Sequence, residues 1–341
     1  MRMIAMKVPE NYLQQAGVLN KVGEYVAPLA RRVLIVAGGH ALGVAGDALG
    51  HSLQREGIAF DVARLTGKCT LETVQNLARQ AQESGAQGVV GLGGGAVMDT
   101  AKGVGELAGQ LPVIQVPTVA ATCAAWSPFS VLYNRQGGHS GSLPLRRFPA
   151  WIVDALAKWF EFSPYQSPDG DAPGLTLQLK FSAMALEVFE SSAMQALEDN
   201  RRQRVTRALV QTIDAVIAFA GLANSVRDES QRIGVAHAIH NSMTHQQAFH
   251  HWLHGEKVGY GLAVQAILQH RDPVDREPLL GWLRRMEVPL TPAEWGSGDP
   301  RPLLAGIAAG VKIKPEAREH LPFPVDSASL QQALLATLNR Q

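Results

Sequence analysis

The sequence has little of three things: cysteine, net charge and long apolar runs. Its 341 residues include only two cysteines, Cys69 and Cys123, which excludes a disulfide framework and is typical of a reducing cytoplasm. The 31 Lys and Arg against 30 Asp and Glu give a net charge of +1, so we expect no nucleic-acid partner. No apolar run reaches membrane-spanning length and the opening residues are too short for a secretion signal, so we expect no membrane partner.

Histidine, in contrast, is concentrated in one place. Six of the 11 histidines fall in the 18 residues from 237 to 254. The rest of the composition is ordinary for a folded protein, with 46% apolar and 18% charged residues, and the length suffices for two domains. The histidine cluster is therefore the feature that a functional interpretation has to explain.

The first part of the chain alternates short apolar segments with helix-length amphipathic ones. The apolar segments have the form of strands buried on both faces. Strands are predicted over 33–37, 58–62, 88–92 and 113–116, and helices over 41–56, 70–83 and 97–107. This alternation predicts an α/β fold, in which a Rossmann-like parallel sheet carries helices on both faces.

From residue 128 the pattern changes. Ser130–Asn134, followed by Arg-Gln-Gly-Gly, indicates a hairpin arm, and 143–149 is expected to be irregular because it holds two prolines. From Trp151 onward apolar residues recur every three or four positions, and Asp154–Glu161 is the first clear helix. We therefore expect an α/β domain over 1–134, a hairpin and linker over 135–150, and an all-helical C-terminal domain over 151–341.

A glycine-rich turn joins the third strand to the third helix. Gly91-Leu-Gly-Gly-Gly-Ala96 fits the spacing G-x-G-x-x-A, which lets phosphates approach N–H groups at the positive end of a helix. The same glycines could serve only for tight packing of strand against helix. The turn also follows the third strand rather than the first, and no acidic residue stands about 20 positions later. From these residues alone both interpretations stay open.

The segments around this turn resemble those of a known family. Gly93-Gly-Gly-Ala-Val-Met-Asp-Thr-Ala-Lys102 is similar to the signature of the iron-dependent alcohol dehydrogenase and glycerol dehydrogenase superfamily, and Pro117 to Asn134 is similar to the segment that follows it there. The resemblance implies that the turn binds the pyrophosphate of NAD or NADP. The residues implied to bind this cofactor are Gly94, Gly95, Ala96 and Asp99 at the turn, and Thr118, Ser127, Phe129 and Tyr133 at the nicotinamide end.

Two positions bear on specificity. Where glycerol dehydrogenases have an aspartate for the polyol, this chain has Cys123, and the residues around it resemble a bacterial hydroxycarboxylate dehydrogenase branch that reduces 2-oxo acids. Cys123 is thus either a substrate-contacting residue or a small buried thiol. At the end of the first strand the family has an aspartate that holds the adenosine ribose of NAD, whereas this chain has Gly38. The missing carboxylate removes a barrier to NADP without establishing a preference.

The spacing of the clustered histidines is compatible with metal binding. His237 and His240 are three residues apart, so on a helix they share a face and could bind one ion. Imidazole together with carboxylate suits zinc or ferrous iron, and a catalytic ion keeps a position open for substrate. Clustered histidines on a solvated helix surface are the alternative.

The resemblance makes a more specific assignment. His237-Ala-Ile-His-Asn and His254-Gly-Glu-Lys-Val are similar to the two metal-binding segments of glycerol dehydrogenases, and Asp154-Ala-Leu-Ala-Lys-Trp-Phe-Glu161 is similar to the segment with the third ligand. The implied ligands of one divalent metal are Asp154, His237 and His254. His240 would face the nicotinamide or substrate, and either His240 or a metal-bound water is our candidate proton relay. The remaining clustered histidines, predicted to be surface residues, are His245, His250 and His251.

One region departs from the family pattern. Family members have a longer stretch between the hairpin tyrosine and the metal-binding aspartate, whereas Tyr133 and Asp154 are only 21 positions apart here. We therefore expect the sheet to lack one strand and the support of Asp154 to be altered, which can reduce the rate even when every ligand is present.

These observations predict a metal-dependent NAD(P)-linked oxidoreductase that transfers hydride between the nicotinamide and a small 2-oxo or 2-hydroxy acid or a related alcohol. The resemblance also implies association into a homo-oligomer. Two alternatives stay open. A dehydroquinate synthase-like lyase shares the architecture and the glycine turn, and the shortened segment is compatible with a nucleotide-binding member that has impaired catalysis.

Overall fold

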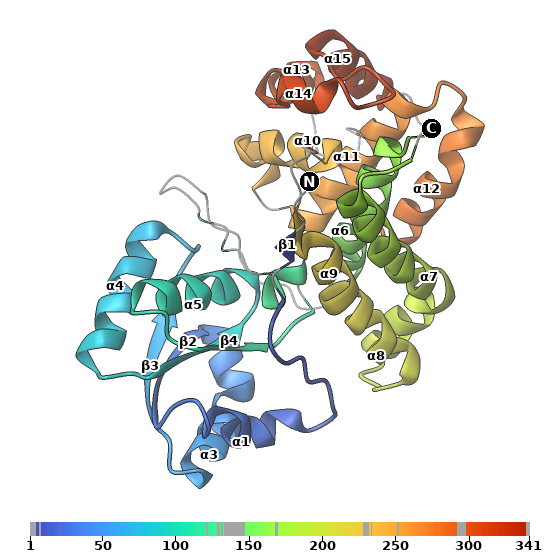
Figure 1. Cartoon of the computed structure of the whole chain (residues 1–341). Helices are drawn as coiled ribbons and strands as arrows, with labels where there is room; N and C mark the ends of the chain where they lie inside the picture. The colour runs from blue at the N-terminus through green and yellow to red at the C-terminus, as the bar shows by residue number, and fades with distance from the viewer. Residues whose placement is uncertain are drawn as a thin grey trace. The chain divides into compact units, whose positions relative to one another are not determined.

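The computed structural model describes residues 5–6, 8–120, 122–127, 130, 132, 147–167, 170–227, 232, 234–250, 252–291 and 298–338. The chain forms two compact units, Lys7–Gly137 and Gly138–Gln341 together with Met1–Met6; Figure 1 colours the chain from blue to red by residue number. Phe129, Tyr133, His251 and most of the predicted hairpin and shortened segment lie outside the described residues.

A four-stranded parallel sheet forms the centre of the unit Lys7–Gly137. Its strands are β2 (Arg32–Gly38), β3 (Ala59–Leu65), β4 (Gly88–Gly93) and β5 (Val113–Pro117), in the spatial order β3-β2-β4-β5. They confirm the four strands predicted from the apolar segments. From β2 the chain continues to β3 on one side and then to β4 on the other, so the carboxyl ends of β2 and β4 form the switch point at which such sheets bind ligands.

Helices cover both faces of this sheet, because successive strand residues point to opposite faces. Val33 and Ile35 share a core with α1 (Val22–Val26) and α3 (Asp47–Arg55), whereas Leu34 and Val36 share another with α4 (Leu71–Glu83) and α5 (Gly95–Leu107). Figure 1 shows α1 and α3 on one side of the sheet and α4 and α5 on the other. The shorter elements of this unit are η1 (Val18–Lys21), α2 (Gly39–Ala41), η2 (Leu42–Gly46) and η3 (Thr122–Ala125).

Local chemistry sets the ends of these helices where the sequence indicates. The hydroxyl of Thr70 accepts a hydrogen bond of 3.2 Å from the backbone N–H of Thr73 and so caps the start of α4. After α4, Gly85 has a φ of +70°, and the backbone N–H of Ala86 donates to the carbonyl oxygen of Ala81 at 2.9 Å. This is the glycine-dependent closure that ends many helices.

The second unit is built mainly from helices, as expected. A two-stranded antiparallel ribbon joins β1 (Ala5–Met6) to β6 (Val226–Arg227), so the beginning of the chain pairs within this unit. Its helices are α6 (Arg147–Phe162), η4 (Ser163–Tyr165), α7 (Pro173–Arg201), α8 (Arg207–Asp214), η5 (Ala215–Phe219), α9 (Ala220–Ser225), α10 (Val235–Thr244), η6 (Gln247–Phe249), α11 (His254–Gln269), α12 (Pro273–Arg285), α13 (Arg301–Gly310), α14 (Pro315–Arg318) and α15 (Ser327–Ala336).

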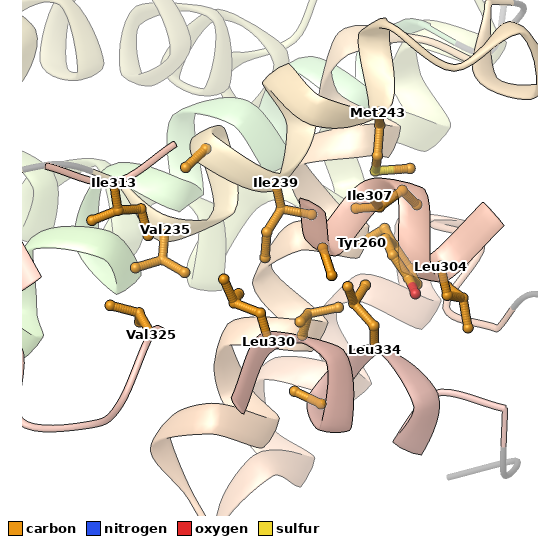
Figure 2. Packing of buried hydrophobic residues seen from close by; sticks show 14 of the residues in the cluster. Val235, Ile239, Met243, Tyr260, Leu304, Ile307, Ile313, Val325, Leu330 and Leu334 are labelled. Atoms are coloured by element: carbon orange, nitrogen blue, oxygen red, sulfur yellow. The ribbon is translucent and has the colours of Figure 1, made fainter. Parts of the chain in front are cut away.

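One core cluster of the described residues in this unit joins α10, α11, α13 and α15. Figure 2 shows Ile239 and Met243 of α10 beside Ile307 of α13, with Leu330 and Leu334 of α15 nearby. The C-terminal helices thus bury one side of the helices that carry the histidine cluster, so the local rigidity of that cluster depends on residues far along the chain.

One sequence expectation about the helical part was wrong. The segment 143–149 was expected to be irregular, but 147–149 already belong to α6, because a proline in the first helical turn loses no hydrogen bond. The stretch Arg207–Ser225 is, by length and composition, apolar enough to cross a membrane, and half of its most apolar window is buried. It packs along α7, and core helices of folded domains have the same composition.

Candidate metal centre and dinucleotide turn

Asp154, His237 and His254 come together in the helical unit, each from a different helix. Nε2 of His237 and Nε2 of His254 lie 3.2 and 2.9 Å from Oδ1 of Asp154, and one potential ligand atom of each residue lies within 4.8 Å of the others. Asp154 is buried, whereas both imidazoles are partly exposed. One carboxylate and two imidazoles that converge in this way fit a divalent cation and leave coordination positions for a further ligand.

Close packing of α11 against its neighbours brings these side chains together. A Cβ atom on Gly255 would overlap the carbonyl oxygen of Ala150 in α6, and one on Gly261 would lie 2.5 Å from the carbonyl oxygen of Ala236 in α10. Real Cβ atoms essentially never approach closer than 3.0 Å, so only glycine permits these distances. Each of the two approaches adjoins one of the two ligand histidines in the sequence.

Glu161 orients His237, a role that the sequence analysis did not predict. Its Oε2 lies 2.7 Å from Nδ1 of His237, and its Oε1 accepts the backbone N–H of the same residue at 2.8 Å. The carboxylate is buried, and Gly234 leaves room for it, since a Cβ atom there would lie 2.6 Å from Oε2. Nε2 of His237 is thereby directed toward Asp154. The signal in the sequence was the spacing of Asp154 and Glu161 by two helical turns.

Neighbouring charges shift the pKa values of Asp154 and His237. Nζ of the buried Lys158 lies 3.8 Å from Oδ1 of Asp154. Burial alone would raise the pKa of Asp154, but the charges of Lys158 and His254 hold this pKa well below its usual range. Burial would lower the pKa of His237, but the carboxylate of Glu161 raises this pKa to about 9, so the ring carries a proton at neutral pH unless a cation displaces it.

His240 lies beside this group without belonging to the three converging ligands. Its ring centroid is 4.3 Å from that of His254, and its Nδ1 is 3.1 Å from Oδ1 of Asn241. Burial and the neighbouring His254 hold the pKa of His240 well below its usual range, so its imidazole is neutral at pH 7. Of the histidines predicted at the surface, His245 is exposed and His250 is half-buried.

The glycine turn of the other unit has the form of an anion site. Gly94 follows β4, and α5 begins at Gly95 without a side-chain cap, so first-turn N–H groups of α5 stay available for phosphate oxygens. The backbone N–H of Thr118 donates to the carbonyl oxygen of Gly93 at 3.0 Å, which places the end of β5 next to the turn. Ala96 is in the first turn of α5, and Gly38 ends the neighbouring strand β2.

A buried ion pair holds the next predicted segment against α5. The carboxylate of Asp99 pairs with Nζ of Lys102 at 2.9 Å, and the same ammonium donates to the carbonyl oxygens of Ala124 and Ser127 at 3.1 and 3.0 Å. Cys123 directly precedes Ala124, and its side chain is buried and in no disulfide bond. Asp99 therefore has a structural role beside the turn, while the contacts of Asp99, Ser127 and Cys123 with cofactor or substrate stay predictions.

Comparison with known proteins identifies the family. A family model described as iron-containing alcohol dehydrogenase matches residues 9–154. Glycerol dehydrogenase from Pseudomonas putida is 30% identical over 355 residues, which cover 97% of this chain and 96% of that protein. The chain belongs to the iron-containing alcohol dehydrogenase family. Hydroxycarboxylate dehydrogenase A from Escherichia coli (strain K12) is 34% identical over 309 residues, which cover 84% of this chain and 83% of that protein.

The fold agrees with this assignment. A probable glycerol dehydrogenase from Sinorhizobium meliloti 1021 superimposes with a TM-score of 0.83 and 24% identity, covering 98% of each chain. The resemblance inferred from the sequence is thus confirmed, as is the combination of a Rossmann-like sheet with a helical domain. This member of the iron-containing alcohol dehydrogenase family is an oxidoreductase.

Proposed function

We propose that this protein is a metal-dependent dehydrogenase that transfers hydride between NAD(P)(H) and a small 2-oxo or 2-hydroxy acid or a related alcohol. The convergence of Asp154, His237 and His254 carries the proposal, because these are ligands of divalent zinc and iron. A bound divalent ion would act as a Lewis acid toward the substrate oxygen. The similarity to hydroxycarboxylate dehydrogenase A and the presence of Cys123 instead of aspartate favour an oxo acid over a polyol.

The protein's own groups have separate tasks in this proposal. Glu161 fixes the ring of His237 so that its Nε2 faces Asp154. His240, neutral and adjacent to His254, accepts or returns the proton of the substrate hydroxyl. In the other unit, N–H groups at the start of α5 hold the dinucleotide phosphates. A bound nicotinamide would supply or take the hydride, and the protein's contribution is alignment and exclusion of water.

The proposal is tested by NADH and NADPH oxidation against a panel of 2-oxo acids, aldehydes and ketones, with Zn²⁺, Fe²⁺ or EDTA. We expect turnover of at least one 2-oxo acid that EDTA abolishes. Replacing Asp154, His237 or His254 by alanine should remove metal-dependent turnover while leaving dinucleotide binding, followed by nucleotide fluorescence, largely intact. His245→Ala removes an exposed histidine of the same cluster and should behave as the wild type.

The outcomes separate the alternatives. If all three alanine variants stay active with EDTA present, the metal assignment is wrong. If the protein binds dinucleotide and one metal ion but turns over no compound of the panel, it is a nucleotide-binding member with impaired catalysis. Family membership favours the oxidoreductase over the dehydroquinate synthase-like lyase.

The proposal also includes a setting and an assembly state. Two free, buried cysteines support a reducing, cytoplasmic environment. The homo-oligomer expected from the resemblance is tested by sedimentation velocity of the purified protein, where a single species of monomer mass would contradict it.

A further inference from the structure

An arginine side chain lies beside the carboxyl end of β2, next to the switch point at which such sheets bind ligands. Arg64 is in β3 and pairs in register with Ala37 of β2, one residue before Gly38 ends that strand. Its neighbours Ala63 and Leu65 are buried in the core formed with α4 and α5. Because side chains alternate along a strand, Arg64 points to the opposite face of the sheet, the face on which α2 begins.

The guanidinium of Arg64 rests on Gly39. A Cβ atom built on Gly39 would lie 2.7 Å from Nε and 2.8 Å from Cζ of Arg64, so the planar group lies directly against the glycine backbone. The side chain of Arg64 is exposed, and it forms no hydrogen bond or ion pair with any residue that the structure describes. An exposed guanidinium of this kind has donors available for a phosphate.

The strand end lacks the carboxylate that would favour NAD. In dinucleotide folds an acidic residue near the adenosine ribose binds its 2′-hydroxyl, whereas a nearby arginine accommodates a 2′-phosphate. Here Gly38, Gly39 and His40 follow one another without an acidic residue, next to the switch point between β2 and β4. The absence of a carboxylate at Gly38 and the presence of the Arg64 guanidinium both favour a cofactor with a 2′-phosphate.

We infer that Arg64 binds the 2′-phosphate of NADP(H) and makes the protein selective for NADP(H) over NAD(H). This inference rests on the proposed dinucleotide-dependent function. A guanidinium pairs with a phosphate through two parallel N–H donors. A hydrogen bond to a charged group contributes enough binding free energy for a preference of roughly 10- to 100-fold for NADP(H) over NAD(H).

Binding measurements test the inference without requiring turnover. Dissociation constants are measured for NADPH and NADH by fluorescence, and for adenosine 2′,5′-bisphosphate and 5′-AMP by calorimetry, on the full chain. The wild type should bind NADPH at least about tenfold more tightly than NADH. Arg64→Ala should weaken NADPH and the bisphosphate roughly 10- to 100-fold and leave NADH and 5′-AMP unchanged.

Two further variants make the test specific. Arg55→Ala removes the same charge from the exposed C-terminal end of α3, before the start of β3, and should leave all four constants unchanged. Gly39→Asp displaces the guanidinium and adds a carboxylate, so it should weaken NADPH at least as much as Arg64→Ala does without weakening NADH.

The results that overturn the inference are distinct from those that overturn the proposed function. Equal or tighter binding of NADH by the wild type, or an equal loss for both dinucleotides in Arg64→Ala, would refute the role of Arg64 while leaving a dehydrogenase intact. Failure to bind either dinucleotide would refute both.

Discussion

Substituting Gly255 by alanine tests whether the approach of α11 to α6 assembles the metal centre. The new Cβ atom would overlap the carbonyl oxygen of Ala150, which is backbone and cannot rotate away. The two helices would have to separate on the order of 1 Å to restore a normal contact. Because His254 directly precedes Gly255, this separation would draw its ring away from Asp154, to which Nε2 is now 2.9 Å distant.

The magnitude follows from two opposing effects. Overpacking a tight contact costs up to about 3 kcal/mol, and replacing glycine by alanine in a helix returns at most about 1 kcal/mol. We therefore expect a net loss of about 2 kcal/mol, or roughly 4–8 °C in Tm for a unit of about 200 residues. A ligand displaced by about 1 Å should also lower metal-dependent turnover by roughly 100-fold.

Gly281→Ala is the matched control. Gly281 lies in α12, where the nearest atom to its Cβ would be Oε1 of Glu277 at 3.6 Å, an ordinary contact. This substitution should raise Tm slightly through helix propensity and leave metal affinity unchanged. Differential scanning fluorimetry and a competition titration with a chromophoric chelator measure the two effects. If Gly255→Ala binds zinc and melts like the wild type, the close approach does not position His254.

Three other predictions concern the same unit. Since Glu161 raises the pKa of His237 to about 9, zinc must displace a proton, and its apparent affinity should rise about tenfold per pH unit from 7 to 9; a flat profile would contradict this. Glu161→Gln should weaken zinc binding roughly 10- to 100-fold at pH 9, where proton competition at His237 costs the wild type only about a factor of two, and should flatten the pH slope below it; unchanged zinc affinity at pH 9 would show that Glu161 does not position His237. Tyr260→Phe deletes the buried 2.9 Å hydrogen bond to Oγ1 of Thr337 and should lower stability by about 1 kcal/mol in urea unfolding, whereas no loss would mean that the bond is energetically neutral.

The two central strands of the sheet could be predicted from the sequence because β2 and β4 are buried on both faces. The segment Val33 to Ala37 has no polar residue that would favour an exposed position, and glycines mark the ends of β2 and β4 as Pro117 marks the end of β5. The end of β3 was less predictable. The alternation of buried and exposed residues continues through Arg64 to Leu65. A charged residue near the end of a predicted strand gives no reason to extend the strand. The role of Arg64 also depends on the pairing of β3 with β2, which the local sequence does not show.

The metal ligands required a different kind of information. The spacing of His237 and His240 indicates only that two histidines share a helix face, and the structure instead brings His237 to residues 83 and 17 positions away in the chain. That encounter depends on tertiary packing, which no local pattern encodes. Glu161 escaped prediction for the same reason, because its partner is 76 residues distant.

The packing of α6 also bears on the shortened segment before Asp154. If that segment positioned the aspartate, its loss of length would displace the ligand. However, α6 begins at Arg147, almost two turns before Asp154, and α11 contacts its backbone at Ala150. The position of Asp154 is therefore set by helix contacts within its own unit, and the same contacts set His237 and His254. Because the glycine turn and Arg64 belong to the other unit, metal affinity and dinucleotide affinity should respond to different substitutions.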